Sequence, residues 1–292
     1  NALTARAAHL LRMHRYDGVV KDCTTIIALD PSRLEAYRLR ANAYNHQLLF
    51  SKAIADLSKF VVQYQMHDNT YADALSKRAF AYDQEHKYHA AIQDYTAAIK
   101  CDPKNSDYFV SRAIVYKHER NWKKAIADCN RAIALNPSSP AIYKVRGYSR
   151  EMLHSPAYAL SDLDKLVKLL PTVDTHRLRG YKRLAARDYL GSLEDFDYVL
   201  QEEPADTKTA ARYEKAKKVL QASVSRKTLS VPDLPTRRNS LAPIDLSRKS
   251  QQDLLREGYA LLMDGKTERA VQYIAAAVKA NPNDPRARRL LA

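Results

Sequence analysis

Apolar and small residues recur along this chain at the spacing of amphipathic helices. Within residues 106–137, Phe109 and Tyr116 fall on one stripe of a first helix, and Ala125 and Ala132 fall on one stripe of a second. The polar letters HERNW between them predict a turn. The residue before a proline disfavours helical backbone, so the closing letters LNP end the second helix. The stretch predicts a helix-turn-helix hairpin whose small residues let the two backbones approach closely.

The hairpin pattern repeats along the chain. AIQDYTAAIKCDP, residues 91–103, and AIADCNRAIALNP, residues 125–137, share Ala, Ile, Asp, Ala, Ile and Pro at equal positions. Prolines mark the ends of most units: Pro31, Pro103, Pro137, Pro171 and Pro204. One unit lacks the proline and carries extra residues near VVQYQMHDNTY, which predict a longer second helix and loop. Such repetition predicts an array in which each hairpin buries its apolar face against the next.

These units resemble the tetratricopeptide repeat, a helix-turn-helix family with a period of about 34 residues. The third unit matches all eight positions of the family pattern: Leu75, Ala79, Tyr82, Tyr88, Ala91, Tyr95, Ala98 and Pro103. The resemblance implies an all-α fold, a right-handed α-solenoid of tetratricopeptide hairpins. We expect six units over residues 1–204 and a closing helix, TKTAARYEKAKKVLQAS, so that the first domain covers residues 1–221.

The composition changes near residue 222. Residues 222–250 are rich in Ser and Pro, carry six Lys or Arg against two Asp, and show no helical period. We expect a basic linker or docking arm there. Residues 251–292 predict a further hairpin of the same kind and the start of another helix. Within the arm, RRNSL resembles the substrate pattern of basophilic kinases, so Ser240 is a candidate phosphorylation site.

Each of the first six units carries an Arg in its first helix and an Asp sixteen residues later in its second helix. The pairs are Arg6 and Asp22, Arg40 and Asp56, Arg78 and Asp94, Arg112 and Asp128, Arg146 and Asp162, and Arg179 and Asp195. The planar guanidinium group meets a carboxylate through two parallel hydrogen bonds, so we expect bridges between the two helices of each unit. Their regular recurrence argues against a single catalytic site.

The family resemblance implies that first helices line the inner groove of the array. We expect the groove to present the residue after each small Gly or Ala and the residue one turn earlier: Arg38, Asn42, Phe80, Val110, Ile114, Lys144, Tyr148, Arg177 and Tyr181. This row favours an extended or helical protein segment with aromatic anchors, and Lys144 and Arg177 would recruit its acidic residues. The alternative is that these side chains pack against neighbouring repeats.

The net charge of +15 makes acidic partners plausible. We expect a non-enzymatic scaffold or adaptor that binds proteins, and by analogy a cytoskeletal or ciliary assembly, since tubulin is acidic. One alternative is a co-chaperone that binds acidic chaperone tails. Arg38 and Asn42 fill two places of the clamp that such proteins use, whereas Lys77, Asp107 and Ser111 do not fit the other three. Another alternative is an RNA-binding helical array.

Catalytic, metal and cofactor sites have no counterpart in the sequence. The nine His residues stand singly, and the spacings of Cys23, Cys101 and Cys129 fit no zinc or redox motif. We therefore expect no enzymatic activity, no metal and no cofactor, and three thiols kept reduced. There is neither an apolar run of membrane-spanning length nor a signal peptide. These features favour a cytoplasmic protein without membrane insertion.

Overall fold

The computed structural model describes residues 2–64, 66–228, 250–263 and 267–281, and within them every regular element is an α-helix. Two compact units make up the chain, residues 1–179 and 180–292. The helices of the first unit are α1 (Ala2–Arg12), α2 (Tyr16–Leu29), α3 (Leu34–His46), α4 (Phe50–Gln63), α5 (Asn69–Gln84), α6 (Tyr88–Cys101), α7 (Ser106–His118), α8 (Trp122–Leu135), α9 (Pro140–Met152) and α10 (Pro156–Leu169). Helix α11 (Val173–Ala185) crosses the division.

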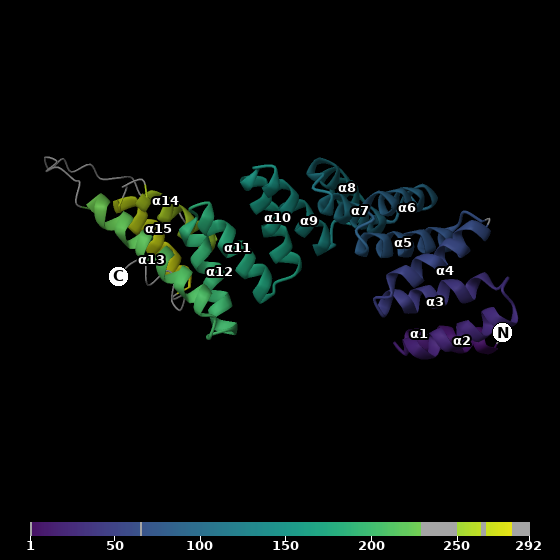
Figure 1. Ribbon diagram of the computed structural model, residues 1–292. Helices are drawn as coiled ribbons and strands as arrows, with labels where there is room; N and C mark the ends of the chain where they lie inside the picture. The colour runs from purple at the N-terminus through teal and green to yellow at the C-terminus, as the bar shows by residue number, and fades with distance from the viewer. Residues whose placement is uncertain (1, 65, 229–249, 264–266, 282–292) are drawn as a thin grey trace, which may run out of the picture. The chain divides into compact units, whose positions relative to one another are not determined.

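Consecutive helices of the first unit pair as hairpins, from α1 and α2 to α9 and α10 (Figure 1). Each hairpin also packs on the next one through its second helix. The predicted fold class, an all-α solenoid of tetratricopeptide hairpins, is confirmed. Within the second unit, α12 (Tyr189–Glu202) packs on α13 (Thr207–Thr228), and α14 (Gln251–Met263) forms a hairpin with α15 (Thr267–Ala280).

Small side chains at the helix contacts explain how the hairpins close. Ala113, Ala125 and Ala132 are fully buried where α7 meets α8, and Ile142 of α9 joins the same core cluster. An Ala side chain leaves room for two backbones to approach, while the larger residues fill the space that remains. Within residues 1–179 the core is thus a series of clusters shared by neighbouring hairpins.

Two helix boundaries differ from those expected from the sequence. Helix α4 has 14 residues, like α2, α6 and α8, so the extra residues of its unit do not lengthen the second helix. Most of them lengthen α5 instead, which has 16 residues where α3, α7 and α9 have 13. The Asp68 side chain accepts hydrogen bonds from Thr70 N and Tyr71 N and starts that helix. Helix α13 runs to Thr228, so residues 222–228 of the predicted linker are helical, and no proline lies between Thr207 and Thr228 to interrupt the helix.

The turns inside the hairpins share one backbone motif that usually needs glycine. In the second repeat, Leu48 N donates to Asn45 O and Leu49 N donates to Tyr44 O, the hydrogen-bond pattern of a Schellman motif. Leu48 has a positive φ of 60°. The same left-handed conformation occurs at the equivalent residue of the other turns, also without glycine: His14, His86, Arg120, His154 and Arg187. Each turn therefore holds one strained residue.

Replacing Leu48 by glycine should stabilise the protein by about 0.5–1 kcal/mol. A left-handed conformation costs a residue with a Cβ about 1–2 kcal/mol, and glycine removes that cost while losing somewhat more chain entropy on folding. Leu48 is 69% exposed, so little packing is lost. The measurement is the thermal unfolding midpoint of Leu48→Gly beside that of Leu49→Gly, whose φ is −91°. A fall in the midpoint for Leu48→Gly would contradict the expected relief of strain.

Candidate partner-binding surface

The structure brings together the Arg and Asp residues of the first five predicted pairs. In the fourth repeat, Arg112 Nε lies 2.7 Å from Asp128 Oδ2 and Arg112 Nη2 lies 2.8 Å from Asp128 Oδ1. The other pairs form equivalent bridges: Arg6 with Asp22, Arg40 with Asp56, Arg78 with Asp94 and Arg146 with Asp162. The five carboxylates are buried, so each bridge satisfies a charge that lies away from water.

Arg6 differs from the others because its side chain is 61% exposed. Its hydrogen bonds to Asp22 nevertheless lower the pKa of that carboxyl. The two residues of the sixth predicted pair, Arg179 and Asp195, belong to different compact units, and that pair stays a prediction. Within the second unit, Asp195 accepts a hydrogen bond from Arg183 Nη1 at 3.1 Å.

Four of these arginines, and also Arg179, contact the preceding repeat, which the sequence analysis missed. Arg112 Nη1 donates to Thr96 Oγ1 of α6 at 2.9 Å, so one guanidinium group joins three helices. Equivalent bonds join Arg40 to Thr24, Arg78 to Ser58, Arg146 to Asn130 and Arg179 to Asp164. The signal was a side-chain acceptor 15 to 20 residues before each Arg. The arginines therefore fix the register between successive repeats as well as within each repeat.

The predicted inner row contains two exposed aromatic anchors. Phe80 of α5 is 43% exposed and Tyr148 of α9 is 47% exposed. Each ring is supported edge-on by an aromatic residue that starts the second helix of the preceding repeat, Phe50 for Phe80 and Trp122 for Tyr148. Such supported but exposed rings are suited to bury against a partner at small entropic cost.

Two apolar members of the row are less accessible. Val110 is 7% exposed and belongs to the core cluster of α7, α8 and α9, so its prediction as a partner-binding residue is corrected. Side chains one turn before the small residue point into the adjoining repeat there, because α9 packs closely on α7. Ile114 is half-buried and packs on the same cluster. The alternative of packing between repeats thus holds for Val110.

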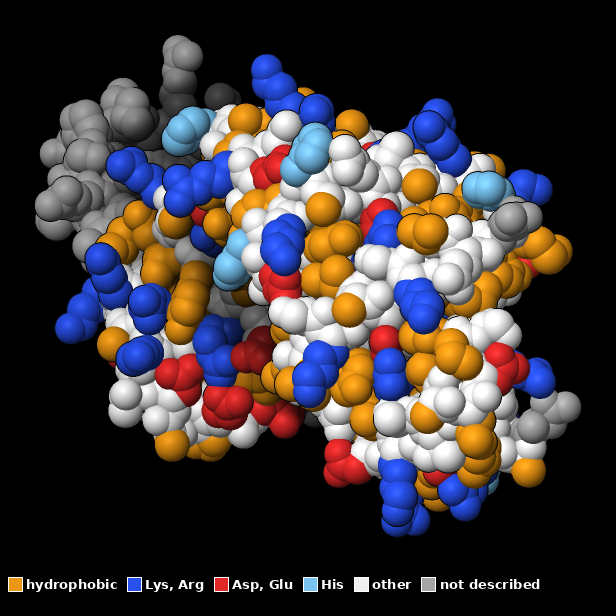
Figure 2. Space-filling view, turned by 45° about the vertical axis from the view of Figure 1, so that its right-hand side comes forward, with side chains coloured by type: hydrophobic (Ala, Val, Ile, Leu, Met, Phe, Trp, Pro, Cys, Tyr) orange, Lys and Arg blue, Asp and Glu red, His pale blue; other side chains and the backbone are white. Residues whose placement is uncertain are grey.

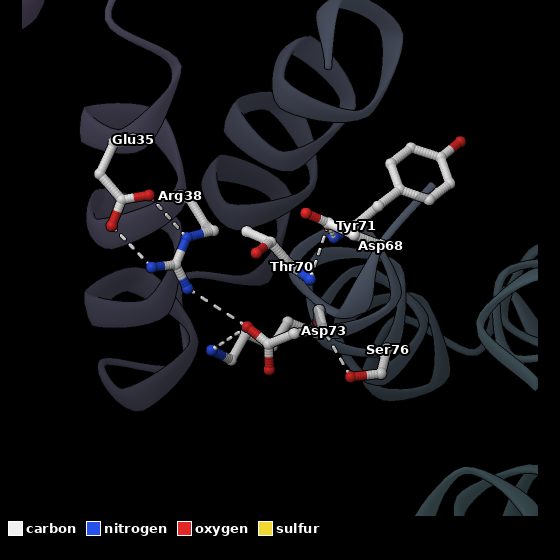
Figure 3. Close-up of polar contacts among 8 residues, drawn as sticks. Glu35, Arg38, Asp68, Thr70, Tyr71, Asp73 and Ser76 are labelled. Atoms are coloured by element: carbon white, nitrogen blue, oxygen red, sulfur yellow. Dashed lines mark hydrogen bonds and ion pairs between the residues drawn. The ribbon is translucent and has the colours of Figure 1, made fainter. Parts of the chain in front are cut away.

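The predicted cations of the row differ in how they are paired. Arg38 donates to both carboxylate oxygens of Glu35 and also to Asp73 (Figure 3). Asp73 also accepts a hydrogen bond from Lys77 Nζ at 2.8 Å. Arg177 pairs with Asp174 three residues earlier.

Lys144 is exposed, and no ion pair is recorded for it within the part of the chain that the structure describes. Of the three predicted cations, Lys144 is the one best placed to meet an acidic group.

Tyr181 lies in the second unit, against the closing helix. Its hydroxyl lies 3.1 Å from Thr209 Oγ1, and the Arg212 guanidinium carbon lies 4.3 Å from the centre of its ring. Both partners belong to α13. Tyr181 is therefore half-buried by residues of its own chain, and Phe80 and Tyr148 are the better candidates for anchors.

A cavity of about 600 Å³ opens between the first helices of the second, third and fourth repeats. Its lining includes the predicted residues Asn42 and Phe80. Residues that sequence reasoning did not assign to the groove also line it: Asn45, Asp73, Tyr95 and Tyr108. These residues lie on α3, α5, α6 and the start of α7. The family pattern used to predict the groove does not include their positions in the repeat.

Neither a metal site nor a reactive buried thiol occurs among the described residues. They contain no group of three or more His, Cys, Asp or Glu residues that could hold a metal ion. Burial raises the pKa of the Cys23 and Cys129 thiols to about 12, so both are poor nucleophiles. None of the described helices combines the length and the apolar character needed to cross a bilayer. Ser240 lies outside the described residues.

Comparisons with known proteins agree with this architecture. A family model described as the tetratricopeptide repeat matches residues 77–140 and 255–292. Among curated proteins, DnaJ protein P58IPK homolog B of Oryza sativa subsp. japonica is 31% identical over 61 residues, which cover 21% of this chain and 13% of that protein. This chain thus spans a small part of the curated relative's length.

Several solved structures share the fold. MamA is 23% identical with a TM-score of 0.52, over 56% of this chain and 93% of that one. YrrB, described as a TPR protein with an unusual peptide-binding site, is 20% identical with a TM-score of 0.52, over 66% and 97%. A tetratricopeptide repeat protein from Parabacteroides merdae ATCC 43184 is 17% identical with a TM-score of 0.54, over 88% and 97%. The family model thus assigns residues 77–140 and 255–292 to the tetratricopeptide repeat, and the repeated hairpins and the structural similarities show the same fold beyond these regions.

Proposed function

We propose that the protein is a non-enzymatic scaffold that holds a segment of a partner protein along the first helices of residues 1–179. The observation that carries the proposal is the pair of exposed rings, Phe80 and Tyr148, each in edge-on contact with another aromatic residue. Exposed aromatic anchors are typical of protein interfaces. The peptide-binding site described for YrrB, which shares the fold, adds support.

The test is a crosslinking experiment on the full-length protein in native extract, read by mass spectrometry. The double variant Phe80→Ala, Tyr148→Ala removes both anchors. A matched control, Val62→Ala, Tyr158→Ala, removes two exposed side chains from the second helices α4 and α10. We expect at least one protein partner to be lost from the first variant and kept by the control. Identical partners for wild type and both variants would overturn the proposal.

The net charge supports a finer proposal, that the partner has an acidic surface such as the exterior of a microtubule. Exposed Lys144, next to the Tyr148 anchor in α9, would then meet an acidic residue. Co-sedimentation with taxol-stabilised microtubules tests this proposal, and Lys144→Glu should weaken the binding more than a charge change on α4, Lys52→Glu. Absence of co-sedimentation at low salt would contradict it.

RNA binding is the less favoured alternative. On the face seen in Figure 2, Lys and Arg side chains are interspersed with Asp and Glu and form no continuous basic track. A single-stranded RNA oligomer that bound through its phosphates would lose affinity steeply with salt. Binding through aromatic anchors would depend on salt much less, so a salt titration separates the two functions.

A further inference from the structure

The cavity between α3, α5 and α7 has a hydrogen-bond acceptor at its wall that no described residue satisfies. Asn45 lines the cavity and is 8% exposed. Its Nδ2 donates to the Lys77 carbonyl oxygen at 3.1 Å, which fixes the orientation of the amide. Asn45 Oδ1 is buried and has no hydrogen-bond partner among the described residues. A ligand that donates a hydrogen bond there would remove the cost of this unsatisfied oxygen.

The charged groups around the cavity favour a cation. Asp73 and Asp107 line it, against the single ammonium group of Lys77. Asp73 is already shared by Lys77 and Arg38.

Asp107, in contrast, is exposed at the first turn of α7. Within the described residues, its carboxylate is recorded only with the Ser106 hydroxyl at 3.4 Å. Burial, and after it the charge of Asp73, raise the pKa of the neighbouring Tyr108 hydroxyl. Among the described residues, no cation is recorded beside the Asp107 carboxylate.

Aromatic faces complete the lining. The Phe80 ring is exposed, and Tyr108 is half-buried beside Asp107. A cation over such a ring is attracted by the electron density of its face, and a planar cation can also stack on it. The cavity therefore combines a buried acceptor, a carboxylate with no cation recorded among the described residues, and the rings of Phe80 and Tyr108.

We propose that this cavity binds an arginine side chain of the partner protein. A guanidinium group carries five N–H donors and no acceptor, matches a carboxylate through two parallel bonds, and stacks on aromatic rings. It can pair with the Asp107 carboxylate and stack on the Phe80 ring, and Asn45 Oδ1 is a further acceptor of the same lining. A carboxylate ligand would face Asp107 and the Asn45 oxygen and be repelled by both. A lysine ammonium lacks the planar face that suits the rings.

This inference rests on the proposed function, because the cavity shares Phe80 with the row of anchors. It gives the bound segment a direction. An arginine would lie at the second to fourth repeats, and the acidic residue expected by Lys144 would lie at the fifth. A partner segment with a basic residue at one end and an acidic residue at the other fits both groups.

The test uses ¹⁵N-labelled full-length protein and the probe N-acetyl-arginine methylamide, followed by NMR at the Asn45 side-chain amide and the Ser111 backbone amide. The matching citrulline probe lacks the positive charge, and the matching lysine probe keeps the charge but lacks the planar group. We expect saturable shifts with the arginine probe and at least about tenfold weaker binding of citrulline. Asp107→Asn should weaken the arginine probe at least about fivefold, whereas Asp174→Asn, an equal charge change at a 90% exposed carboxylate, should not.

Equal affinities for arginine and citrulline, or an Asp107→Asn variant that binds the arginine probe like wild type, would overturn the inference. An equal affinity for the lysine probe would overturn the choice of arginine. The probe tests binding to the cavity in the absence of a partner protein. A negative result with the probe is therefore distinct from a negative result for the scaffold proposal. If the probe fails while crosslinked partners still depend on Phe80 and Tyr148, only the arginine site is lost.

Discussion

Asp162→Asn should destabilise the protein by about 3 kcal/mol, the largest loss expected for a single polar substitution here. The Asp162 side chain is 1% exposed and accepts hydrogen bonds from Arg146 Nε, Arg146 Nη2 and Arg150 Nη1. An asparagine side chain has nearly the same shape but no charge, and its amide NH2 group would face the N–H donors of the two arginines. Removing one partner of a buried ion pair costs about 3–5 kcal/mol. Arg146 keeps some contact with water, which favours the lower end.

Trp122 provides the measurement, because it is the single tryptophan and its ring lies 5.8 Å from that of Tyr148 in α9. Its fluorescence during urea unfolding reports the region around the fourth and fifth repeats. The matched control is Asp164→Asn, two residues along α10, where the carboxylate is 45% exposed and bonds to Arg179. Asn130 makes the equivalent bond to Arg146 as an amide, so the control should cost less than about 1 kcal/mol. Equal losses for the two variants would show that the buried bridge has no special weight.

A double variant separates the loss of the ion pair from other effects of the substitution. Arg146→Met, Asp162→Leu replaces both partners by apolar side chains. If the loss in Asp162→Asn comes from buried, unpaired guanidinium groups, the double variant should recover part of it, although Arg150 still lacks its acceptor. No recovery would place the loss in packing instead of charge.

The hairpins and their bridges could be predicted because they depend on local and repeated features. Small residues such as Ala79 and Ala113 recur where two helices must touch, and both are fully buried. The Arg and Asp spacing repeats because one geometry recurs in each unit. A repeat array multiplies a weak signal, so a period shared by several imperfect units predicts the fold well.

The accessible surface could not be predicted to the same degree, because accessibility depends on the neighbouring repeat. Ile114 and Phe80 occupy equivalent positions after a small residue, yet Ile114 packs on a core cluster while Phe80 stays 43% exposed. Tyr181 follows the same rule in sequence and is held by two residues of α13. The unsatisfied oxygen of Asn45 depends on the position of the Lys77 carbonyl, which no sequence pattern reports.

Gly180→Ala should destabilise the second unit by about 1–2 kcal/mol, although alanine is the better helix former. A Cβ at this position would lie 2.6 Å from Phe196 Cε1 and 2.8 Å from Phe196 Cδ1. Phe196 is fully buried, so its ring cannot move away into solvent. Overpacking a core costs about 1–3 kcal/mol, which exceeds the gain of about 1 kcal/mol from replacing glycine in a helix.

Gly147 offers the matched control, because it holds the equivalent position one repeat earlier and Ala is common there in this chain. Its added Cβ would meet Asp162 Cβ at 3.2 Å, a tight contact but not a clash with a ring. Gly147→Ala should therefore change stability by less than about 1 kcal/mol.

Phe196→Leu should cost stability alone but rescue Gly180→Ala, because the smaller side chain leaves room for the methyl group. The free energies come from urea unfolding followed by circular dichroism, since Trp122 lies in the other unit. Additive losses in the double variant would show that the ring of Phe196 is not what requires glycine at this position.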